Sequence, residues 1–139
     1  MATTQAYTSV TLIAGADLSS DQYKLVKVDS TTRQVILCSA TTDRPLGVLL
    51  NAPTSGQGAE VAVSGIMKVQ TDGSVAIGNL VGPDADGLAQ GKGPVATDGA
   101  GSGAITWGYA AGVALETDTG ANTYVEILID KMAIITAIA

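Results

Sequence analysis

The segment Tyr124-Val125-Glu126-Ile127-Leu128-Ile129-Asp130 alternates in side-chain character more regularly than any other part of the chain. Val125, Ile127 and Ile129 fall on one face of an extended backbone, and both carboxylates fall on the other. A period of two predicts a β-strand with one face turned toward a core. Further apolar runs occupy 23–29, 34–38, 46–50, 60–63, 66–70, 75–80, 105–109 and 112–115.

Turn-forming residues separate these runs. Asp-Gly pairs at 72–73, 86–87 and 98–99 suit hairpin turns, and Ser64-Gly65 suits a bulge or bend. Prolines 45, 53, 83 and 94 are expected in connections, and no window of a dozen residues has a helical period. The chain is therefore expected to form one small all-β domain, as a barrel, a sandwich or a tulip-like arrangement of short strands, with very little helix.

Two parts of the chain resemble each other. Leu25-Val26 leads to Gly47-Val48-Leu49-Leu50, and Leu80-Val81 leads to Gly112-Val113-Ala114-Leu115. A Gly-Ala turn and a further apolar strand follow in both cases. The second copy is longer, and its extra residues coincide with the glycine-rich stretch. The pattern predicts a duplicated β-meander, with chance recurrence in a Gly/Val-rich chain as the alternative.

Composition divides the 139 residues into three parts. Residues 1–14 are expected to form an N-terminal arm or edge strand, and 15–130 the β domain, with an exposed glycine-rich loop at 91–103. Residues 131–139 form an apolar C-terminal tail. That tail is either a last strand tucked into the core or a segment that packs on a neighbouring subunit or larger surface.

The residue inventory excludes several classes of function. There is no His for proton transfer or metal binding, and one Cys cannot form an internal disulfide or a multi-Cys site. A net charge of −6 disfavours nucleic acid as a partner, and no apolar run is long enough for a membrane span. We also expect no signal peptide, no metal, no cofactor and no catalytic residues, so the chain is not predicted to be an enzyme.

Individual motifs favour structural roles. Cys38 ends an apolar run and is expected to be a small buried hydrophobe, since no His can activate it. The segment 84–87 resembles the start of a calcium loop but lacks the closing Glu, because residue 95 is Val, so a tight turn is expected. Residues 91–96 fit the pattern G-x-G-x-x-A of dinucleotide-binding loops. Such a loop lies between a strand and a helix, and neither is expected here, so the match indicates no nucleotide site. Trp107 and Tyr109 are expected to pack in the core or between subunits.

The order and spacing of several segments resemble the small phage capsid cement (head decoration) proteins of the domain-of-unknown-function 2190 type. The matching segments are Ala14–Ser19, Tyr23–Asp29, Asp43–Leu49, Gly58–Gly65, Val75–Val81, Asp84–Gly87, Gly112–Glu116 and Tyr124–Ile129. They span about residues 14 to 129. Residues 92–106 and the tail after Asp130 depart from the family pattern.

This resemblance implies a non-enzymatic structural protein of the virion. Such proteins are made in the host cytoplasm, bind the outer surface of an expanded capsid and stabilise it. The implied partner is the major capsid protein, and the implied assembly is a homotrimer, with a dimer as the alternative. The candidate contact residues for the capsid or a sister subunit are Thr3, Thr4, Gln5, Tyr7, Trp107, Tyr109, Ile134, Ile135 and Ile138, together with the 91–103 loop.

Two other functions are compatible with the sequence. A small β-barrel that binds carbohydrate or a host receptor would use Trp107, Tyr109 and the glycine-rich loop. A minimal hydrolase would use carboxylates such as Asp43, Glu60, Glu116 or Glu126, although solvated surface charge is their ordinary role.

Overall fold

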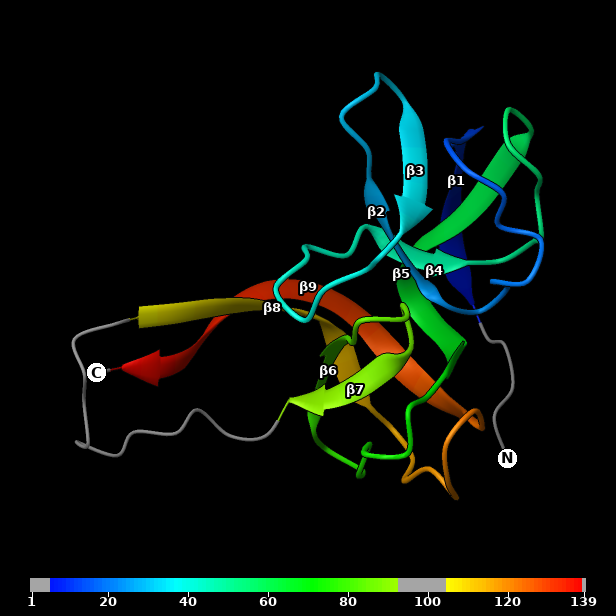
Figure 1. The fold of residues 1–139 in the computed structure, drawn as a ribbon. Coiled ribbons are helices and arrows are strands. Elements are labelled where there is room, and N and C mark those ends of the chain that lie inside the picture. The colour runs from blue at the N-terminus through cyan, green and yellow to red at the C-terminus, as the bar shows by residue number, and fades with distance from the viewer. Residues whose placement is uncertain (1–5, 93–104, 139) are drawn as a thin grey trace.

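The computed structural model of the chain describes residues 6–92 and 105–138, with side chains described over 6–92 and 109–131. In the described residues all regular structure is β, which confirms the predicted fold class. The nine strands are β1 (Tyr7–Ala14), β2 (Leu25–Val28), β3 (Gln34–Leu37), β4 (Gly47–Leu49), β5 (Gly58–Gln70), β6 (Leu80–Pro83), β7 (Ala89–Lys92), β8 (Ile105–Ala114) and β9 (Tyr124–Ile138) (Figure 1).

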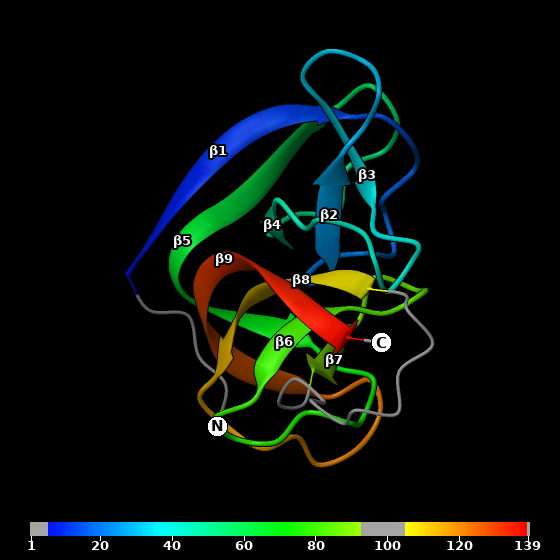
Figure 2. The ribbon, with the colours of Figure 1, turned by 90° about the vertical axis from the view of Figure 1, so that its left-hand side faces the viewer.

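The strands form one mixed sheet in the order β1-β3-β2-β4-β5-β9-β8-β6-β7. An additional antiparallel ladder joins β1 to β5, so the first five strands close into a ring (Figure 2). In the second half, a parallel bridge joins Thr71, just after β5, to Ala89 at the start of β7. Each half of the chain is thus a unit of five paired strands, and β5 belongs to both.

The predicted duplication is confirmed by the register of the strands. Leu25 lies opposite Val48 where β2 meets β4, and Leu80 lies opposite Val113 where β6 meets β8. The sequence repeats align Leu25 with Leu80 and Val48 with Val113, so the same pair of positions lies opposite in both units. The structure also extends the repeat, because β1 and the second half of β5 are its matching first strands.

Backbone conformation repeats at the same level of detail. Tyr23 and Gly78 both have positive φ, at 66° and 83°, and each sits two residues before the equivalent strand. Gly56 and Asn122, at 85° and 62°, are a second matching pair. Asn tolerates a positive φ better than most residues other than glycine, so the turn at Asn122 is ordinary. Tyr rarely adopts a positive φ, so the composition of the segment gives no sign of the turn at Tyr23.

The core follows the duplication. The interior of the first unit is formed by Ala14, Leu18, Val26, Val35, Leu49, Ala59 and Val61. The positions that match these in the second unit are held by Thr71, Val75, Val81, Ala89, Ala114, Val125 and Ile127, each at most 2% exposed. A larger cluster also includes Leu25, Val48 and Ala62 from the first unit. The interior of the first unit is thus a cluster of its own, and the larger cluster joins residues of both units.

Several predicted boundaries are wrong. The run at 75–80 is mostly a turn, and the strand begins only at Leu80 and ends at Pro83, which we expected in a connection. β5 continues through Ser64-Gly65, where the register against β1 shifts between Thr8 and Ser9, as expected for a bulge. β7 begins before the predicted loop and takes Gly91 and Lys92 from it. The rest of that loop, 93–104, lies outside the described residues.

Both ends of the predicted domain continue in strands. Tyr7–Ala14 is β1, which is paired with β5 and, at its end, with β3. Residues 131–138 continue β9 and pair with the first half of β8, through Trp107↔Ile135 and Ile105↔Ile138. We call this two-stranded part, 105–110 with 132–138, the β8–β9 extension. It projects beyond the rest of the fold in Figure 1.

Candidate functional site

The predicted contact residues lie in different parts of the structure. Thr3, Thr4 and Gln5 are outside the described residues. Tyr7 opens β1 and is 43% exposed. Trp107, Ile134, Ile135 and Ile138 have backbone positions in the β8–β9 extension, where Gly108↔Ile134 continues the ladder. Their side chains are not among those described.

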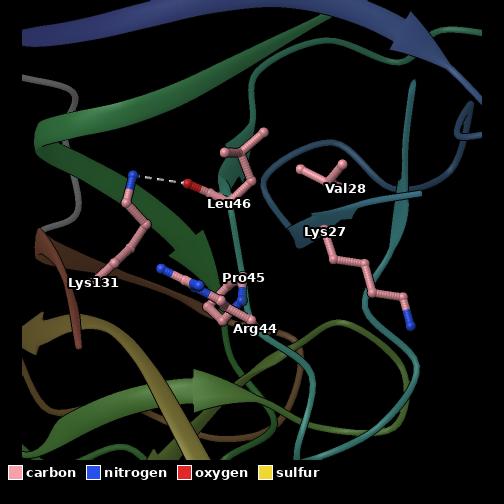
Figure 3. Close-up of a pocket in the computed structure, with 6 residues that line it drawn as sticks. All are labelled: Lys27, Val28, Arg44, Pro45, Leu46 and Lys131. Carbon is pink, nitrogen blue, oxygen red and sulfur yellow. Dashed lines mark hydrogen bonds between the residues drawn. The ribbon is translucent and has the colours of Figure 1, made fainter. Parts of the chain in front are cut away.

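The described part of the chain contains a cavity of about 460 Å³ between the first unit and β9. Its lining comes from three places far apart in the sequence: β2, the segment before β4, and β9. The lining residues are Lys27, Val28, Arg44, Pro45, Leu46 and Lys131 (Figure 3). Three of the seven Lys and Arg residues of an acidic chain therefore meet at one cavity.

Lys27 is neutralised by a carboxylate. Its ammonium lies 2.7 Å from Asp43 Oδ2, and the same oxygen accepts hydrogen bonds from the amides of Ser39 and Ala40. Burial raises the pKa of Asp43, but the Lys27 ammonium and the two amides outweigh it and hold the pKa below the usual value. Asp43 thus ties the segment before β4 to β2, and it positions the next residue, Arg44.

Arg44 and Lys131 form the cationic part of the cavity. The Arg44 guanidinium lies over the ring of Tyr109, 5.7 Å from its centroid. The two residues stand three positions before Gly47 and Gly112, so matching places in the two units contact each other. Lys131 Nζ donates to the carbonyl oxygens of Leu46, at 3.1 Å, and Val63, at 3.0 Å. The pKa of Lys131 is lowered, first by burial and then by the positive charge of Arg44.

Val28, Pro45 and Leu46 give the cavity an apolar side. Val28 is 58% exposed although it is aliphatic, while Pro45 is buried. A cavity with fixed cations next to aliphatic carbon can hold an anion with an apolar neighbour.

A second polar and aromatic cluster lies on β5 and β9. Lys68 Nζ is 4.4 Å from the ring centroid of Tyr23, and Tyr23 meets Tyr124 edge to face with centroids 6.0 Å apart. The perpendicular rings give no flat stacking platform. Cation–π and edge contacts of this kind stabilise the junction of the units and hold Tyr23 in its left-handed conformation.

The other residues singled out by sequence are structural where they are described. Cys38 is fully buried, and burial raises the pKa of its thiol to about 12, with a further contribution from Asp43. Asp84 Oδ1 accepts the amides of Asp86 and Leu88, which confirms the predicted tight turn. No cluster of three metal-binding side chains occurs in the described residues.

Of the four carboxylates considered for hydrolysis, Glu126 is only 9% exposed, so the solvated surface charge that we expected is wrong for this residue. Asp43 binds Lys27, as above, and Glu60 accepts a hydrogen bond from Ser9 at 3.3 Å. Glu116 Oε1 accepts a hydrogen bond from the backbone amide of Glu126 at 3.0 Å, in the second unit.

Helices of the length and apolarity that a membrane span requires do not occur in the part of the chain that is described.

Sequence reasoning missed the cavity. Lys27 and Arg44 appeared in the sequence analysis only as residues of the capsid-cement pattern, and Lys131 carried no signal of its own. These side chains are separated by 17 and 87 residues along the chain and meet only through the path of β9. In comparisons with known proteins, no family model and no curated protein matches this chain.

Proposed function

We propose that this protein is a capsid decoration protein, which binds the outer surface of an expanded phage head and stabilises it without catalysis. The residue pattern across 14–129 supports the proposal, because it resembles that of capsid cement proteins in order and spacing. The partner in this proposal is the major capsid protein, the assembly is a trimer or a dimer, and the location is the virion surface.

The observation that carries the proposal is the β8–β9 extension. The first unit has no equivalent of it, because β4 has only three residues where β8 has ten. Residues 105–110 and 132–138 lengthen the β8–β9 strand pair so that it reaches beyond the rest of the fold (Figure 1). Among the described residues, the outer edges of 105–110 and 132–138 pair with no other strand. A strand pair of this kind is suited to add to a neighbouring surface, whether of a sister subunit or of the shell.

The rest of the fold suits a passive cement. The two units share β5, one core cluster contains residues of both, and side chains fasten the connections, as Asp43 and Asp84 do. Such a protein acts by binding one state of the shell better than another. Each bound copy adds to the free-energy difference in favour of the expanded state, so the preference grows with the number of copies bound.

Co-sedimentation with expanded and unexpanded heads tests this function. Saturable binding to expanded heads alone is expected, and the number of copies per shell then gives the symmetry of the site. A variant ending at Met132 removes the second strand of the extension while leaving Lys131 in place. It is expected to lose binding but to retain the far-UV circular dichroism of the wild type.

The outcomes separate the alternatives. A folded wild-type protein that binds neither form of the head would overturn the decoration proposal. A glycan screen would then examine the surface-recognition alternative. If the shortened variant binds as well as the wild type, the contact lies elsewhere on the protein.

A further inference from the structure

We propose that the cavity between β2, the 44–46 segment and β9 binds an acidic side chain of a partner protein, with an aliphatic neighbour of that side chain packed on Val28 and Leu46. This goes beyond capsid decoration, because it concerns the chemistry that the cavity accepts, whichever protein supplies it.

The charges at the cavity are the first argument. Lys27 has Asp43, but no ion pair of Arg44 or Lys131 with a carboxylate is found among the described residues. The Arg44 guanidinium has the Tyr109 ring as its neighbour and offers five N–H donors. Two positive groups thus stand together in a chain whose net charge is −6.

The geometry of Lys131 is the second argument. Two of its three N–H donors are directed to carbonyl oxygens, one of Leu46 (Figure 3) and one of Val63, and these bonds hold the ammonium in place at the cavity. The third donor remains for a ligand. Burial and, after it, the positive charge of Arg44 lower the pKa of Lys131, so an anion between the two groups would relieve their repulsion.

The apolar side of the cavity and the negative net charge of the protein indicate which class of anion the cavity binds. Val28 is exposed beside the cations, so a ligand that also offers aliphatic carbon would cover it. A free phosphate has no such carbon, and a polyphosphate backbone would be repelled by the acidic surface. A peptide that carries Asp or Glu next to Leu or Val satisfies both sides of the cavity.

Amide NMR shifts of the full-length ¹⁵N-labelled protein provide the test. The probe is acetyl-Leu-Asp-Leu-amide, compared with acetyl-Leu-Asn-Leu-amide and inorganic phosphate. We expect saturable shifts at Val28, Leu46 and Lys131 with a dissociation constant on the order of 1 mM, and at least about tenfold weaker binding of the Asn peptide. The Asp peptide should also raise the pKa of the Lys131 side chain.

Arg44→Gln is expected to weaken the Asp peptide by about tenfold. Arg33→Gln is the matched control, because the variant loses the same charge from an exposed residue that lies outside the cavity. Each of three results would overturn the proposal: the Asp and Asn peptides bind equally well, Arg44→Gln binds the Asp peptide as tightly as the wild type does, or phosphate binds as strongly as the Asp peptide. No head is used in this test, so its failure is distinct from failure of the decoration proposal.

Discussion

Replacement of Gly47 or Gly112 by alanine should be far more damaging than an added methyl group normally is. These glycines hold matching positions in β4 and β8. A Cβ built at Gly47 overlaps the carbonyl oxygen of Ala62, and one built at Gly112 overlaps that of Leu128. Val48 and Val113, the next residues, pair with Ala62 and Leu128, so the obstacle is the backbone of a central partner strand.

The expected loss follows from the movement that would be needed. To accept the new atom the strands must separate by about 1 Å, which is too far for a close-packed core to absorb locally. The nearby bonds, Leu50 N to Glu60 O at 2.8 Å and Leu115 N to Glu126 O at 2.9 Å, would then exceed hydrogen-bond range. Overpacking of about 1–3 kcal/mol and one weakened backbone bond of about 1 kcal/mol together predict a loss of about 3 kcal/mol for each variant.

Urea unfolding measures this loss. With a slope of about 2 kcal/mol per molar, the midpoint should fall by about 1.5 M for Gly47→Ala and by a similar amount for Gly112→Ala. Gly58→Ala is the control, since its Cβ would meet only the Thr11 methyl group at 3.4 Å. Its midpoint should stay level or rise slightly. A decrease of about 1.5 M is expected for Gly47→Ala and Gly112→Ala. If both midpoints stay within about 0.2 M of the wild-type value, the backbone overlap does not control stability.

Three further predictions concern single sites. Gly56→Ala should lose about 1 kcal/mol through backbone strain alone, because φ is 85° and no atom lies within 4 Å of the new Cβ; a loss like that of Gly47→Ala would contradict this. Asp43→Asn should reduce the free energy of unfolding at pH 7 by about 1–3 kcal/mol. Since folding lowers the pKa of Asp43, its stabilisation is complete above the unfolded pKa of about 3.9 and is lost as the pH falls through the folded value, so wild type and variant should converge in acid; a constant difference down to about pH 2 would argue against the Lys27 pairing. Cys38 should resist iodoacetamide at pH 8 in the native protein and react after denaturation, because its thiol is buried with a pKa of about 12; native reactivity equal to that of free cysteine would show that the site opens.

Local chemistry explains what was predictable in the fold. Alternation in 124–130 and the Asp-Gly turn at 86–87 act over a few residues, and both appear in the structure as expected. The repeat was also visible, because the same close approach requires glycine at 47 and at 112. Where turn and strand compete, as at 75–79, hydrogen bonds from distant residues decide: the Val75 amide donates to Asp118.

Other features have no local signal. Tyr23 adopts a positive φ because its ring packs with Lys68 and Tyr124, which are brought to it by β5 and β9. The sharing of β5 between two units depends on pairing at both ends of one long strand. A pattern with a period of two shows which face is buried, but it does not show which strand lies alongside.

Short-range periodicity and turn composition were enough to predict the all-β class and the duplication. The sharing of a strand by the two units and the β8–β9 extension at the end of the second repeat were visible only in the tertiary structure. It also brought Arg44 and Lys131 together. Electrostatic and packing contacts act through space, and residues 87 positions apart become neighbours only when the path of the sheet places them so.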